Sequence, residues 1–183
     1  MTDRRRRSGA ARRLVLVTLL VACDGGSDDA PLAESLCPTV RAWSDSTVDA
    51  VNAFRIASRG LDPVQRRARY LEAFDDVAAL RDRMADELGD QDLSGAVGTR
   101  LGEAVDDVAT VIEDGASEAT SLPDAAYDVV AVREGSLVTG VEKAKAIMFN
   151  TLADLADEPG TDVPRGCGRR GALDLSPPAT FPP

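Results

Sequence analysis

The feature that most constrains the fold is the near absence of proline between residues 39 and 157, where Pro63 and Pro123 are the only two. Proline interrupts a helix because it lacks an N–H group and clashes with the preceding turn, but it suits a helix's first position. Both prolines stand where an apolar pattern begins. The sequence shows no sustained alternation of apolar and polar residues, which would indicate strands. We therefore predict that this stretch is helical throughout.

Apolar residues recur at helical spacing in four segments of this stretch. We predict a first helix that opens at Cys37-Pro38-Thr39, followed by helices near 62–89, 93–119 and 124–157. Asp62, one residue before Pro63 and three before Gln65, is the predicted capping residue of the second helix. The residues assigned to the four apolar faces are, in chain order, Val40, Trp43, Thr47, Val51, Phe54 and Ser58; Val64, Leu71, Phe74, Val77, Ala78, Met84 and Leu88; Val97, Leu101, Val105, Val108, Ile112 and Ala116; and Val130, Leu137, Val141, Ala144, Met148, Leu152 and Leu155.

Four amphipathic helices with short connections favour an all-α fold, an antiparallel up-down-up-down four-helix bundle. One part of the fourth helix leaves two alternatives open. Gly135 and Gly140 bracket a short segment there. They indicate either a close approach between two helices or a kink or break that opens a pocket.

The first 23 residues have the pattern of an export signal. Six arginines lie between Arg4 and Arg13, and an apolar run follows from Leu14 to Ala22. Nine residues are too few to cross a hydrocarbon core of about 30 Å. The segment ends in Leu20-Val21-Ala22-Cys23, which resembles the lipobox of bacterial lipoproteins. This resemblance implies cleavage after Ala22 and attachment of lipid to the thiol of Cys23.

The lipobox resemblance also divides the chain. It implies a signal peptide over 1–22, a flexible tether over 23–36, a helical domain over 37–167 and a disordered proline-rich tail over 168–183. The mature protein would lie on the extracytoplasmic face of a bacterial membrane, held by two or more acyl chains on Cys23. An ordinary secretory leader is the alternative. Arg12-Arg13 also resembles a twin-arginine signal, so the export route stays open.

Removal of the leader would leave a strongly acidic chain. The full sequence carries a net charge of −10, and without the leader's six arginines and one acidic residue it would hold 15 basic and 30 acidic residues. Such a surface lacks the clustered Lys and Arg that bind phosphate, so no nucleic-acid partner is expected. Repulsion from anionic lipid also predicts that the domain stands away from the bilayer.

Cysteine and histidine usage restricts the chemistry. After Cys23 only Cys37 and Cys167 remain, and an oxidising compartment predicts a disulfide between them; two free thiols are the alternative. In the predicted bundle these two residues would lie at the same end. The chain has no histidine, which excludes Ser-His-Asp and Cys-His catalysis and the usual zinc and di-iron ligand sets. We assign no catalytic residue, metal ligand or cofactor.

Four charged residues are candidates for a ligand site. Helical spacing places Arg67 and Arg81 within the apolar face of the second helix, and Arg133 and Glu134 beside that of the fourth. If desolvated arginines met Glu134 inside the bundle, they would form an internal site for an anionic or zwitterionic ligand. The alternative is that the arginine stems lie along the edge of the core with their charged ends in water.

These observations favour a non-catalytic lipoprotein that binds another envelope component or a small ligand. The alternative is an enzyme or cation-handling lipoprotein that uses carboxylates and arginines alone. The acidic pairs Asp75-Asp76, Asp106-Asp107 and Glu113-Asp114 do not favour it. Neighbouring residues on a helix point about 100° apart, so these pairs indicate a solvated acidic face.

Overall fold

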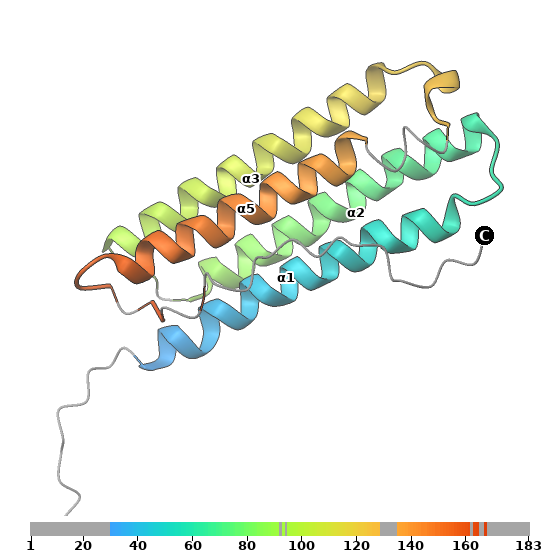
Figure 1. The fold of residues 1–183 in the computed structure, drawn as a ribbon. Coiled ribbons are helices and arrows are strands. Elements are labelled where there is room, and N and C mark those ends of the chain that lie inside the picture. Colours follow the sequence, from blue (N-terminus) through green and yellow to red (C-terminus); the bar gives the residue numbers. More distant parts are fainter. Residues whose placement is uncertain are drawn as a thin grey trace, which may run out of the picture.

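The computed structural model describes residues 30–91, 93, 95–128, 135–161, 163, 164 and 167. Over these residues the chain is all helical and contains no strand. Four long helices lie side by side in Figure 1, and a short 3-10 helix, η1, follows the third of them. The elements are α1 (Ala30–Ala57), α2 (Pro63–Gly89), α3 (Gly95–Ser121), η1 (Asp124–Ala126) and α5 (Ser136–Asp157). The prediction of an all-α fold with four helices is confirmed.

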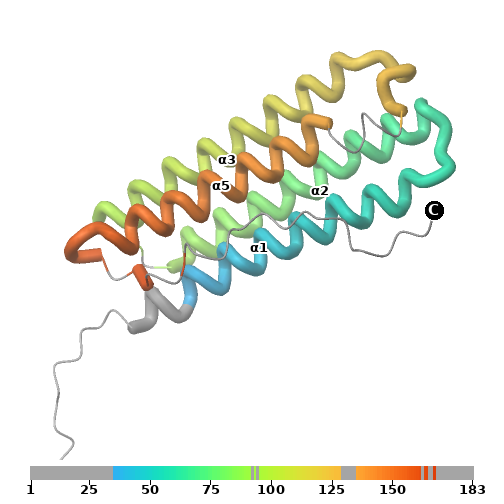
Figure 2. The backbone as a smooth tube through the Cα atoms, in the orientation of Figure 1, coloured from blue at the N-terminus to red at the C-terminus, as the bar shows by residue number. Residues whose placement is uncertain are grey.

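The helices enclose one apolar core. Packing is most extensive between α3 and α5, followed by α1 with α2 and α2 with α3. In Figure 2, α3 lies beside α5 and α1 lies beside α2. Every residue assigned to the first apolar face, from Val40 to Ser58, is buried. The six described residues assigned to the last face, from Leu137 to Leu155, are buried as well. The helical period of the sequence thus located most of the core.

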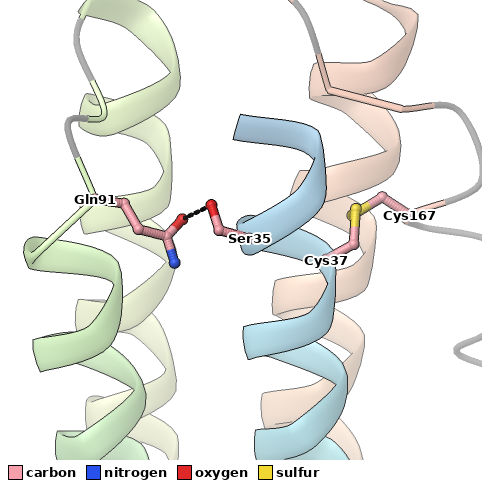
Figure 3. Close-up of a disulfide and its surroundings, with 4 residues drawn as sticks. All are labelled: Ser35, Cys37, Gln91 and Cys167. Carbon is pink, nitrogen blue, oxygen red and sulfur yellow. Dashed lines mark hydrogen bonds between the residues drawn. A yellow bond between two sulfur atoms is a disulfide. The ribbon is translucent and has the colours of Figure 1, made fainter. Parts of the chain in front are cut away.

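The first helix begins earlier than predicted. α1 starts at Ala30, so the assignment of 30–36 to a flexible tether and of the helix start to Cys37 was wrong. Pro38 lies inside the helix, although proline removes one backbone hydrogen bond. Tertiary contacts stabilise the early turns. Leu36 is fully buried, and the side chain of Gln91, just after α2, bonds the hydroxyls of Ser35 (3.1 Å, Figure 3) and Thr39 (3.2 Å).

A disulfide joins α1 to the far end of the chain. The sulfur atoms of Cys37 and Cys167 are bonded, the Cα atoms lie 5.4 Å apart, and both residues are buried (Figure 3). This is the predicted pairing. It connects residues 130 positions apart, so it closes nearly the whole helical domain into one loop.

The start of α2 follows its predicted capping chemistry but not its predicted face. The Asp62 carboxylate accepts from the Gln65 backbone N–H (2.9 Å), and the Gln65 side chain accepts from the Asp62 N–H, which completes a capping box. However, Val64 is 61% exposed rather than part of the core. Arg66 takes the inward position in this first turn.

The predicted fourth helix is divided. Residues 124–126 form η1, and a long helix begins only at Ser136, after the extended backbone of Gly135. Residues 129–134 lie outside the described residues, and with them Val130. From Ser136 the helix is continuous through Gly140 to Asp157. Tyr127, Asp128 and Gly135 are not helical, whereas the segment between Gly135 and Gly140, where a kink or break was one alternative, is continuous helix.

Among the described residues, none of the helices combines the length and the apolar character needed to span a membrane.

Candidate functional site

A hollow in the described part of the chain lies between α3 and α5, beside η1. We call it the α3–α5 cavity. Its volume is about 510 Å³, within the range of small-molecule sites. Polar and apolar groups both line it. The residues are Tyr70, Val111, Asp114, Gly115, Glu118, Leu122, Ala126, Tyr127, Gly135, Ser136, Thr139, Gly140 and Lys143.

Two buried tyrosines form the inner wall of the α3–α5 cavity. The Tyr70 hydroxyl accepts a hydrogen bond from the backbone N–H of Leu137 (2.9 Å), which satisfies a donor in the first turn of α5. The Tyr127 hydroxyl donates to the carbonyl of Ala119, near the end of α3. The two rings pack edge to face at 5.5 Å. Both phenols therefore hold helix ends in place.

The same tyrosines belong to an aromatic cluster that reaches the core. Tyr70 packs edge-on against Phe54 of α1 (5.3 Å) and Phe74 of α2 (5.4 Å). Each such pair contributes about 0.5–1.5 kcal/mol beyond simple burial. Burial also raises the pKa of the Tyr127 phenol, an effect that the nearby positive charge of Arg67 partly offsets. Ring contacts thus hold both tyrosines in the inner wall, and the Tyr127 phenol is uncharged at neutral pH.

Arg66 fastens this wall to the start of α2. Its guanidinium donates to the carbonyl of Tyr127 and to the carbonyl of Leu61 (2.6 Å), and only 8% of the residue is exposed. Both acceptors lie outside helices; without Arg66 the Tyr127 carbonyl would be buried, and the Leu61 carbonyl partly buried, without this donor. Local sequence patterns do not single out Arg66, because its acceptors lie in loops that only the folded chain brings together.

The outer edges of the α3–α5 cavity carry opposite charges. Asp114 and Glu118 lie one turn apart on α3 and are exposed, and Lys143 is exposed on α5. Among the described residues, none of these three side chains forms an ion pair within 4.0 Å. The cavity therefore offers two carboxylates on one edge and an ammonium group on the other.

A glycine allows the aromatic cluster to pack against α3. A Cβ atom on Gly115 would lie 2.9 Å from the Phe74 ring and 3.5 Å from the Ser136 carbonyl oxygen, so a larger residue would push the ring aside. A Cβ atom on Gly140 would meet the Val111 carbonyl at 3.7 Å, an ordinary contact. The aromatic cluster therefore needs glycine at position 115 to pack against α3. At position 140 a Cβ atom would fit against Val111 without displacing it.

The arginines predicted to form an internal site do not share one. Arg67 donates to the Thr120 carbonyl (2.9 Å) and lies 3.6 Å from the Asp124 carboxylate at the surface. Arg81 contacts the carboxylates of Asp82 (2.7 Å) and Glu113 (3.8 Å), both of which are exposed. Fourteen residues of helix, about 21 Å, separate the two arginines. This arrangement agrees with the alternative of stems along the core edge.

The remaining predicted sites are placed as follows. Arg133, Glu134 and Cys23 lie outside the described residues. Asp75, Asp76 and the other residues of the acidic pairs are exposed. No group of three or more His, Cys, Asp or Glu residues that could hold a metal ion occurs in the described part of the chain.

A second hollow, of about 320 Å³, lies where α2 ends and α3 begins. Apolar and small residues line most of it, and its two polar side chains are Gln91 and Asp106. The Gln91 amide is already bonded to α1. This hollow offers few groups for recognition, so the α3–α5 cavity is the better candidate site.

Lys145 is the one buried lysine among the described residues, and it supports a prediction. Burial lowers the pKa of its ammonium group, although Asp45 and Glu142 act in the opposite direction. We expect Lys145→Met to raise the free energy of unfolding near pH 7 by about 1 kcal/mol, because methionine fills the same space without a desolvated charge.

The gain from Lys145→Met should shrink at alkaline pH. The unfolded chain binds more protons than the native state between the lowered pKa and the ordinary lysine value of 10.5, so wild-type stability rises there relative to the variant. Urea unfolding of both proteins across this range measures the difference. Lys143→Met, at an exposed position, is the matched control. A clearly less stable Lys145→Met variant at neutral pH would contradict the expectation.

Comparisons with known proteins give no relative. No family model, no curated protein and no solved structure matches the chain.

Proposed function

We propose that this chain is a lipid-anchored, extracytoplasmic helical lipoprotein that binds a small ligand or an envelope component at the α3–α5 cavity, without catalysis. The observation that carries the proposal is the lipobox-like Leu20–Cys23 followed by a domain whose two other cysteines pair with each other. Disulfides persist in oxidising compartments, so the Cys37–Cys167 bond independently supports export.

The contacts between helix ends support an up-down-up-down order for the four helices. Gln91, after the end of α2, bonds Ser35 near the start of α1. Arg100, near the start of α3, pairs with Glu158 just after α5 (2.9 Å). In the proposed bundle the start of α1 and the disulfide share one end with these contacts. The α3–α5 cavity lies toward the other end, because Arg66 in the first turn of α2 contacts Tyr127.

In this arrangement the lipid anchor and the α3–α5 cavity lie toward opposite ends of the bundle. Cys23 precedes Ala30 by seven residues, which can span at most about 25 Å. The 27 residues of α2 extend about 40 Å from its start near the cavity to its end. We therefore place the anchored end of the domain up to about 25 Å from the bilayer, and the cavity at the far end, facing the surrounding compartment.

The groups around the cavity favour binding over catalysis. The Tyr70 and Tyr127 hydroxyls are engaged by backbone groups of α5 and α3. Catalysis by a hydroxyl needs a base within hydrogen-bond reach. The Ser136 hydroxyl lies 3.4 Å from the Tyr70 hydroxyl, a phenol that is too weak a base to activate it. A site that combines a fixed aromatic wall with separated surface charges is suited to binding a ligand.

Membrane attachment is tested by Cys23→Ala. We expect wild-type protein in the membrane fraction and the variant in the soluble fraction, since lipid can no longer be attached. Cys37→Ser is the matched control: it also removes one thiol but should stay with the membrane. The proposal would be contradicted if Cys23→Ala and wild type partition into detergent equally.

A further inference from the structure

The α3–α5 cavity has a charge pattern that selects a class of ligand. We infer that it binds a small zwitterion of about dipeptide length, with the ammonium group beside Asp114 and the carboxylate beside Lys143. This inference deepens the proposed binding role of the cavity and rests on it. It does not depend on how the protein is anchored.

The first argument is the sign and placement of the charges. A purely anionic ligand would meet Asp114 and Glu118 on α3, and a purely cationic one would meet Lys143 on α5. Like charges in contact disfavour both. A ligand that carries both charges at opposite ends can pair with both edges. None of the three side chains forms an ion pair with the described residues, so pairing with a ligand breaks no existing ion pair among them.

The second argument is the spacing between the edges. The Gly115 position lies against Ser136 and the Gly140 position against Val111, so α3 and α5 pass each other in opposite directions. By this register Lys143 faces the level of Val108, six residues and about 9 Å along the axis from Asp114. Both side chains incline toward the start of their own helix, which brings their charged ends closer together. Two extended residues span about 7 Å, a suitable length.

The third argument is the surface between the charges. Tyr70 and Tyr127 present packed rings whose hydroxyls are already bonded to the backbone, and Val111 lines the same wall. Such a wall can bury an apolar side chain of the ligand. The cavity volume of about 510 Å³ has room for two residues.

The test uses one dipeptide in three forms with the purified full chain in detergent. The forms are leucyl-alanine with both ends free, its N-acetylated derivative, and its C-terminal amide. Isothermal titration calorimetry measures their affinities. We expect the free dipeptide to bind best and each blocked form to bind at least tenfold more weakly, because each has lost one charged contact.

Variants assign each end of the ligand to its edge. Lys143→Gln should weaken the free dipeptide at least tenfold but leave the amide unchanged, since the amide no longer uses the lysine. Asp114→Asn should weaken the free dipeptide but not the N-acetylated form. Asp86→Asn, an exposed acid near the end of α2 and outside the cavity, is the control and should change none of the affinities.

The inference would be overturned if no form gave a heat of binding at millimolar concentration, or if all three forms bound with equal affinity. Binding of the amide alone would instead indicate a cationic ligand and would also contradict it. Because peptide binding is measured on purified protein, its failure is distinct from a failure of membrane attachment in the Cys23→Ala experiment.

Discussion

Replacing Cys37 by serine is expected to lower the free energy of unfolding by about 4–5 kcal/mol, the largest effect of any single change considered. The disulfide to Cys167 spans 130 residues of sequence, and the entropy that a cross-link removes from the unfolded chain grows with the loop it closes. Domains of this kind are stable by only about 5–15 kcal/mol in total. The variant should therefore unfold at a clearly lower urea concentration and a lower melting temperature.

Controls can assign this loss to the disulfide itself. Cys167→Ser and the double variant Cys37→Ser/Cys167→Ser should each lose about as much as Cys37→Ser, because all three remove the same bond. Wild-type protein treated with reductant should match them. If thiol reagents label both residues in denatured, unreduced wild type, the disulfide is absent. A loss below about 1 kcal/mol would show that it contributes little to stability.

Arg66→Met is expected to cost about 3 kcal/mol, the second large effect. The substitution removes the Arg66 donors from the buried carbonyl of Tyr127 and the partly buried carbonyl of Leu61. Methionine replaces the apolar stem, so the loss reports mainly on the hydrogen bonds. Because Arg66 also fixes the position of Tyr127, the inner wall of the α3–α5 cavity should loosen. Urea unfolding measures the first effect, and dipeptide affinity the second.

Arg69→Met is the matched control for this prediction. Arg69 lies on the same helix, is more than half exposed, and pairs with Glu72 at the surface (2.6 Å). Exposed ion pairs contribute little, so its loss should stay within about 0.5 kcal/mol of wild type. Equal stability of the Arg66→Met and Arg69→Met proteins would refute the role assigned to Arg66.

The regular parts of the fold could be predicted from local sequence. The face from Val40 to Ser58 is buried throughout because its spacing matches one side of a helix. The capping box at Asp62 and Gln65 formed because its chemistry is complete within four residues. The pairing of Cys37 with Cys167 followed from the number of cysteines left after export.

Other features depend on contacts distant in sequence. Pro38 suggested a helix start, but Gln91 bonds Ser35 and Thr39 on both sides of it and supports an earlier start at Ala30. Angular spacing pointed to Arg67 as the inward arginine, whereas Arg66 is the buried one because it meets the carbonyls of two loops. Local periodicity contains no information about either set of partners.

The α3–α5 cavity was only partly foreseeable. Gly135 and Gly140 did indicate a possible break and pocket, and both line the cavity. Lys143 and Asp114 are each exposed residues with no distinguishing pattern in the local sequence. Their relation across the cavity arises from the register between α3 and α5, which is set by packing in the core and not by either helix.

The intact mass of the protein extracted from its native membranes decides whether it is a lipid-anchored protein in an oxidising compartment. We expect a chain that begins at Cys23, carries a diacylglyceryl group or further acylation, and has lost two hydrogens to the Cys37–Cys167 bond. An unacylated Cys23 in a chain that still carries residues 1–22 would contradict it.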